Sequence, residues 1–126
     1  MRKSIALVSI TLLLGLAASI AGAAESKAVQ SMAGILVGLN HFPSAGDKQT
    51  LQQIADDKAT TADERTVAQA LMGVAHMAAA GDKPKLEAIA GDAKASGGVK
   101  TLADVLLKVT HHASDADKER LKALTQ

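Results

Sequence analysis

A period of 35 residues constrains this chain more than any other feature of its sequence. Shifting the sequence along itself by 35 positions aligns three copies without a gap, and the copies begin near Ser26, Thr61 and Ser96. Periods of about 20–50 residues are typical of repeat proteins, in which every copy forms the same supersecondary unit. Six alignment columns hold one residue type in all three copies: Ala33/Ala68/Ala103, Leu36/Leu71/Leu106, His41/His76/His111, Asp47/Asp82/Asp117, Lys48/Lys83/Lys118 and Leu51/Leu86/Leu121.

Each copy carries two helical patterns separated by a break before the repeated Asp. The Ser or Thr ahead of each apolar run is suited to cap a first helix, because its side-chain oxygen accepts from a free backbone amide. The repeated Asp fits the start of a second helix, where a negative charge interacts favourably with the positive end of the helix dipole. The second helix keeps only a narrow apolar stripe, which is typical of an outer, amphipathic helix. Two columns therefore receive structural roles in the repeat: Leu36, Leu71 and Leu106 in the first helices, and Asp47, Asp82 and Asp117 at the start of the second.

The sequence predicts an all-α fold of three consecutive helical hairpins, with the first helices inside and the second helices outside. Such hairpins can form a small helical bundle or a short α-solenoid. The copies are expected at about 26–60, 61–95 and 96–126, within one domain of residues 24–126. Gly97 and Gly98 are expected to delay or fray the first helix of the third copy, because glycine weakens helices.

The first 23 residues have the order of a secretory signal peptide. A basic Met-Arg-Lys start is followed by the uncharged and mostly apolar residues 4–20, and then by the small residues Ala21-Gly22-Ala23. We expect cleavage after Ala23, or after Ala24 as second choice, and a periplasmic or secreted bacterial product. An uncleaved anchor helix is the alternative, but the apolar run is short for a membrane span and glycines interrupt it.

Composition excludes several classes of partner and site. The full chain has 14 basic and 13 acidic residues, and Arg2 and Lys3 leave with the signal peptide, so the net charge changes from +1 to −1. A nearly neutral domain without a basic stripe is not expected to bind nucleic acid, or a membrane after signal cleavage. The chain contains no Cys and a single aromatic residue, a Phe. Disulfides, thiolate metal sites and base-stacking platforms are therefore excluded.

The repeated histidines are the candidate chemistry of this sequence. His41, His76 and His111 share one column, and His112 follows the last of them. Imidazole is the commonest metal ligand and changes charge near neutral pH, so these four side chains are the candidate metal ligands. Alternatively, each ring lies in the last turn of a first helix and stabilises that turn through the helix dipole or a contact with the following Asp. Equivalent positions in an open stack lie about 8–10 Å apart, too far to share one zinc ion, which favours the structural role unless the copies close around a common axis.

No assembled catalytic motif accompanies the histidines, so we expect a protein that is not an enzyme and needs no cofactor. The first functional hypothesis is an exported, periplasmic helical-repeat binding or scaffolding protein with an unknown protein partner, and a homo-oligomer is possible. The alternative is a periplasmic metal- or pH-responsive protein that uses the repeated histidines. Rings that converge and face solvent favour the alternative, whereas rings bonded separately to their own turns favour the first hypothesis.

Overall fold

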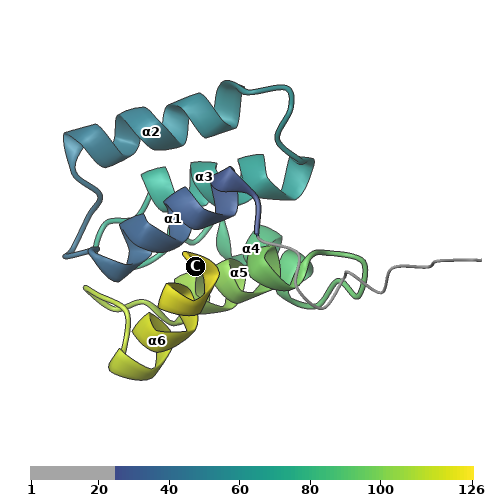
Figure 1. Ribbon diagram of the computed structural model, residues 1–126. Helices are drawn as coiled ribbons and strands as arrows, with labels where there is room; N and C mark the ends of the chain where they lie inside the picture. Colours follow the sequence, from purple (N-terminus) through teal and green to yellow (C-terminus); the bar gives the residue numbers. More distant parts are fainter. Residues whose placement is uncertain (1–24) are drawn as a thin grey trace, which may run out of the picture.

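The computed structural model describes residues 25–126, so the expected signal peptide at residues 1–23 lies outside the described residues. This part of the chain is all-α, with six helices and no β-strand (Figure 1). Over the same residues, no helix combines the length and the apolar character needed to cross a membrane. The helices are α1 (Lys27–Val37), α2 (Ala45–Asp56), α3 (Ala62–Met72), α4 (Lys83–Ala90), α5 (Gly97–Lys108) and α6 (Asp115–Leu124).

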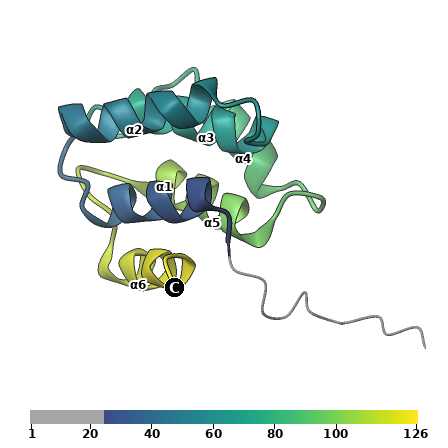
Figure 2. The ribbon, with the colours of Figure 1, turned by 45° about the horizontal axis from the view of Figure 1, so that its top comes forward.

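The helices form a small bundle around three central members. The first helices α1, α3 and α5 contact one another, and α2, α4 and α6 lie around them (Figures 1 and 2). Leu36, Leu71 and Leu106 are fully buried where the central helices meet. On the outer helices, Leu51, Ile54, Leu86, Ile89 and Leu121 are buried while most other side chains are exposed. The outer helices are therefore amphipathic, as their narrow apolar stripes predicted.

The structure does not confirm hairpins formed within each 35-residue copy. The most extensive helix contacts join α2 to α3, α4 to α5 and α6 to α1, whereas α1 and α2 contact each other much less. The outer helices α2 and α4 therefore pack mainly on the central helix that follows each of them, and α6 packs on α1. This last contact closes the bundle and excludes the open solenoid.

A hydroxyl side chain caps each central helix in the same way. Ser26, Thr61 and Ser96 accept hydrogen bonds from the backbone amide three residues later, at 3.2, 3.1 and 3.3 Å. Each cap satisfies one of the amides that the first helical turn leaves without a partner. The predicted starts of the three central helices are therefore confirmed.

The two glycines of the third copy do not delay its helix, so that expectation was wrong. Helix α5 begins at Gly97, and Gly98 is buried in its first turn. A Cβ atom added to Gly98 would lie 2.9 Å from Cγ1 of Val29, and closer still to the Glu25 carboxylate. Gly98 therefore lets the start of α1 approach α5, and this packing offsets the low helix propensity of glycine.

The outer helices differ at their N-termini. In α2 and α6, Ser44 and Ser114 accept from the amides of Asp47 and Asp117 at 3.0 and 3.2 Å. The second copy has Ala79 at this position, and α4 begins only at Lys83. The missing cap explains why α4 is the shortest of the described helices, because the first amides of the helix keep no side-chain acceptor.

Candidate metal centre

The segments that follow α1, α3 and α5 meet at one end of the bundle, at the left of Figure 1. Each segment passes through its His with a left-handed backbone, with φ of 68° at His41, 68° at His76 and 70° at His111. These are the only non-glycine residues with positive φ between residues 25 and 126. Positive φ is uncommon outside glycine, although His tolerates it better than most residues. The same unusual backbone therefore recurs at all three histidines.

A closed ring of backbone hydrogen bonds joins the three histidines. The amide of His41 donates to the carbonyl of His111 at 2.6 Å, that of His76 to His41 at 2.6 Å, and that of His111 to His76 at 2.5 Å. Each residue thus gives one bond and receives one, around a common axis. The ring satisfies all six of these backbone groups and holds the three Cα atoms together.

The three imidazoles project from this backbone ring toward one another. Their centroids lie 4.8–5.1 Å apart, and every pair is arranged edge to face. The Nδ1 atoms of His76 and His111 are 3.0 Å apart. One nitrogen from each of the three rings can be chosen so that all lie within 4.8 Å of one another. Three ligand atoms from three distant parts of the chain thus converge at one point.

The histidines do not occupy the positions expected for a structural role, which were the last turn of a helix and a contact with the following Asp. The helices end at Val37, Met72 and Lys108, so each His lies beyond the last turn and outside the helix. No hydrogen bond joins any of the three rings to the following Asp within the part of the chain that the structure describes. Asp47 instead completes a capping box with Ser44, bonding its backbone amide at 3.2 Å. The three rings therefore lie against one another, and the His41 ring also bonds its neighbour Asn40.

The separations suit a shared metal ion. Zinc bound to imidazole at about 2.0–2.1 Å in tetrahedral geometry places its ligand nitrogens about 3.4 Å apart. The distances found here, from 3.0 Å up to 4.8 Å, bracket that value. His76 and His111 are exposed and His41 is half-buried, so a bound ion faces solvent on its outer side.

Asn40 orients one of the three ligands. Its Oδ1 atom lies 2.7 Å from Nδ1 of His41. An amide oxygen can only accept, so this contact requires the proton of the His41 ring on Nδ1 and leaves Nε2 with a free lone pair. Fixing the tautomer of a metal-ligating His in this way is a common role of neighbouring polar groups.

His112, the fourth candidate ligand, is not part of the cluster. Its Nδ1 atom contacts the carbonyl of Ala113 at 2.9 Å, and its side chain lies one residue beyond the backbone ring. Adjacent residues point in different directions, so His111 and His112 cannot both face the axis. The structure therefore brings together three of the four histidines singled out in the sequence.

Apolar side chains flank the cluster. Phe42 and Met77 directly follow His41 and His76, and they are 60% and 47% exposed. They are the only large hydrophobic side chains that are exposed among the described residues. The centre thus combines three imidazoles with an apolar rim.

The strongest ionic contacts lie on the side of the bundle formed by α5 and α6. Arg120 bonds both Asp104 and Asp117, each at 2.9 Å, and Lys108 adds a contact of 3.1 Å to Asp104. The hydrogen bond from Arg120 is the main cause that lowers the pKa of Asp104 below its ordinary value, and the same contact raises the pKa of Arg120. These groups tie α5 to α6 and have no contact with the imidazoles.

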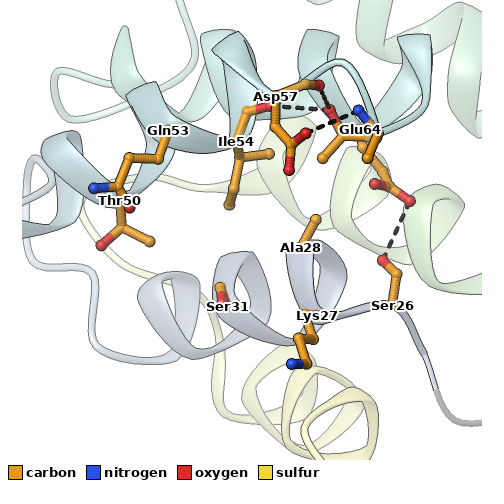
Figure 3. A pocket seen from close by; sticks show the side chains of 11 residues that line it. Ser26, Lys27, Ala28, Ser31, Thr50, Gln53, Ile54, Asp57 and Glu64 are labelled. Carbon is orange, nitrogen blue, oxygen red and sulfur yellow. Dashed lines mark hydrogen bonds between the residues drawn. The ribbon is translucent and has the colours of Figure 1, made fainter.

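A cavity of about 410 Å³ lies between the N-terminal end of α1 and the C-terminal end of α2 (Figure 3). Ile54 of α2 and the carboxylate of Asp57, just after α2, point into it, and Ala28 lines the opposite wall. The carboxylate of Glu64, which is buried, accepts from the Ser26 hydroxyl at 3.2 Å. The cavity lies at the opposite ends of α1 and α2 from the histidines, so it is separate from the imidazole cluster.

Comparisons with known proteins add no family to these observations. No protein-family model, no curated protein and no solved structure matches this chain. Function therefore has to be argued from the site.

Proposed function

We propose that this protein is an exported metal-binding protein whose site is formed by the imidazoles of His41, His76 and His111. The observation that carries the proposal is the convergence of three imidazole nitrogens within 4.8 Å from positions 35 residues apart. Three neutral imidazoles suit borderline divalent ions such as Zn²⁺ and Cu²⁺. Export is supported by the order of residues 1–23, which is that of a secretory signal peptide.

The residue type at the backbone ring favours a ligand role over a purely structural one. A chain that needs φ near +68° most easily places Gly there, and Asn is also well tolerated. The sequence has His in all three places instead. Unfavourable backbone conformations at functional sites are held by the surrounding structure because the side chain is needed there. The imidazole ring, rather than the turn, is then the reason for His.

The proposed architecture is three copies of a 35-residue unit arranged around one axis. It is supported by the three φ values of 68–70°, the three-membered ring of hydrogen bonds and the cyclic packing of outer on central helices. Such an arrangement places equivalent residues of every copy at the same point. One ligand per copy is then enough to build a complete three-imidazole site.

The affinity of the three imidazoles for a metal ion is expected to depend on pH. A protonated imidazole has no lone pair for a metal, so protons compete with the ion for all three ligands. Acidification should therefore release the metal.

Titration of metal-stripped protein with Zn²⁺ tests the proposal. We expect one Zn²⁺ per chain and a roughly 100-fold loss of affinity in His76→Asn, equivalent to about 2.7 kcal/mol. Asn tolerates positive φ, so this variant removes the ligand and keeps the backbone. His112→Asn is the matched control, and it should bind as the wild type does. Equal affinities for wild type and His76→Asn would exclude the site.

Metal content of the protein isolated from its own cell provides an independent measurement. The proposal expects a transition metal at one equivalent or less per chain, removable by a chelator. Recovery of the protein from the cytoplasm with residues 1–23 intact would contradict the exported part of the proposal and leave the metal site standing.

A further inference from the structure

We propose that two copies of this chain face each other across one six-coordinate metal ion, each copy supplying His41, His76 and His111. This inference rests on the proposed metal site and adds its partner, which is a second copy of the same chain. The two proposals make different predictions for stoichiometry and mass, so one experiment separates them.

The first argument comes from coordination. Three imidazoles around one axis occupy one triangular face of an octahedron and leave the opposite face open. That open face points to solvent, because His76 and His111 are exposed. A second copy that is turned over by a twofold axis presents an identical triangle of nitrogens and fills the remaining three positions. Ions that accept six imidazoles, such as Ni²⁺, are suited to this arrangement, whereas Zn²⁺ prefers four ligands and can remain on one copy with a water.

The second argument comes from the side chains around the site. Phe42 and Met77 flank the histidines and are 60% and 47% exposed, as the only large exposed hydrophobics of residues 25–126. Exposed apolar groups gathered at one place mark contact surfaces. In the facing arrangement, the apolar rim of one copy meets that of the other and both leave water.

The third argument comes from charge. Residues 38–46 and 73–81 contain no Asp, Glu, Lys or Arg, and the equivalent third segment is uncharged between Lys108 and Asp115. Two identical surfaces can approach only if like charges do not meet, since a like-charge pair opposes association. The residues next to the three histidines in the chain therefore add no fixed charge to the facing surface, whereas Lys108 and Asp115 lie a few residues away.

The contact is expected to depend on metal. Two exposed apolar side chains per copy bury far less than the roughly 1,200 Å² that a stable protein interface needs. Metal bonds to both copies have to supply the rest of the affinity. The metal-free protein should therefore be a monomer, and a chelator should reverse the dimer.

The experiment measures molar mass by light scattering during titration of the metal-stripped protein with Ni²⁺, with Zn²⁺ in parallel. We expect a doubled mass and saturation at one Ni²⁺ per two chains, and a monomer with one Zn²⁺ per chain. Nickel X-ray absorption of the dimer should count six nitrogen ligands of imidazole type. Chelator should return the mass to that of the monomer.

Variants at the rim test the facing surface. Met77→Lys places a positive charge against its own copy and should weaken the dimer by tenfold or more, with the ratio moving toward one Ni²⁺ per chain. Met77→Leu keeps an apolar side chain and should dimerise as the wild type does. Dimers of equal affinity in both variants would overturn the facing surface.

Three outcomes of the titration are decisive. A monomer that binds one Ni²⁺ per chain overturns this inference and leaves the proposed metal site intact. No binding of Ni²⁺ or Zn²⁺ overturns both proposals. A dimer that persists in chelator shows an interface without metal, and it overturns the coordination argument.

Discussion

The Nδ1 atoms of His76 and His111 lie 3.0 Å apart, although 35 residues separate them in the chain. The backbone amide of His111 also donates to the carbonyl of His76 at 2.5 Å, so the two residues are joined through both backbone and side chain. His41 completes the ring from the first copy. This relationship turns a repeated residue in the sequence into a single site in the fold.

The left-handed backbone at His76 predicts different effects for two substitutions in the metal-free protein. Asn tolerates φ near 68°, whereas a β-branched Val at positive φ is strained. We expect the free energy of unfolding of His76→Asn to stay close to that of the wild type, and that of His76→Val to fall by about 1–3 kcal/mol. Urea denaturation of the two variants in the presence of chelator measures the difference. Equal midpoints would show that the positive φ does not contribute to stability.

Gly97 and Gly98 are adjacent, but we expect Ala to change the stability of the fold in opposite directions at the two positions. A Cβ at Gly97 meets nothing within 4 Å, so Gly97→Ala should stabilise the protein by about 0.5–1 kcal/mol through helix propensity and a less flexible unfolded chain. A Cβ at Gly98 meets Val29 at 2.9 Å, so Gly98→Ala should destabilise it by about 1–3 kcal/mol. Thermal unfolding of both variants tests the pair, which would be contradicted by shifts of the same sign.

We expect a capping residue in place of Ala79, just before α4, to stabilise the protein. Ala79 holds the place of the capping Ser44 and Ser114, and its carbonyl accepts from the amides of Asp82 and Lys83 at 2.9 and 3.2 Å. Ala79→Ser should let the amide of Asp82 bond a side-chain cap in place of the carbonyl, as in α2 and α6, and add about 0.5–2 kcal/mol. Ala80→Ser is the control, since it adds a hydroxyl one residue past the cap. A gain in both variants would exclude capping as the cause.

The pair of Asp104 and Arg120 predicts a dependence of stability on pH. The pKa of Asp104 is lowered in the folded protein from 3.8, with Arg120 as the main cause. A lowered pKa in the fold adds stability above the ordinary value, and this contribution is lost as pH falls through the lowered value. Because the pair is partly exposed, Asp104→Asn should cost only about 0.3–1 kcal/mol at pH 7, and the cost should shrink as the pH falls below the ordinary carboxyl range. Urea unfolding of wild type and variant across this pH range measures the cost, and a cost independent of pH would exclude the ion pair.

We expect Asn40 to affect metal affinity through the orientation of the His41 ring, without a direct contact to the metal. The Oδ1 atom of Asn40 lies 2.7 Å from Nδ1 of His41 and holds the orientation of that ring. Asn40→Ala should weaken Zn²⁺ binding by about 10-fold, as is usual for groups that orient a ligand, with unchanged stability in chelator. Thr110→Ala, at the equivalent place before His111, is the matched control. Equal loss of affinity in both variants would show that Asn40 does not position the ring.

Helix content and the buried faces followed directly from the sequence. The hydroxyl caps at Ser26, Thr61 and Ser96 and the apolar stripes of the outer helices depend on contacts within a few residues, so local periodicity predicts them well. The delay expected at Gly97 and Gly98 was wrong because a distant residue, Val29, decides what fits beside Gly98. Propensity describes a residue in isolation and cannot include such a neighbour.

The sequence by itself determined that every copy offers one His in an uncharged segment, and that convergence needs closure around a common axis. Only the tertiary structure decided that closure, through the packing of α6 on α1 at opposite ends of the chain. Local patterns specify which face of a helix is buried, but not which helix covers it. The left-handed backbone at His41, His76 and His111 could not be predicted from the sequence either, because no glycine stands at those positions. The ring of hydrogen bonds that holds this backbone joins residues far apart in the chain, and it forms only when all three segments meet.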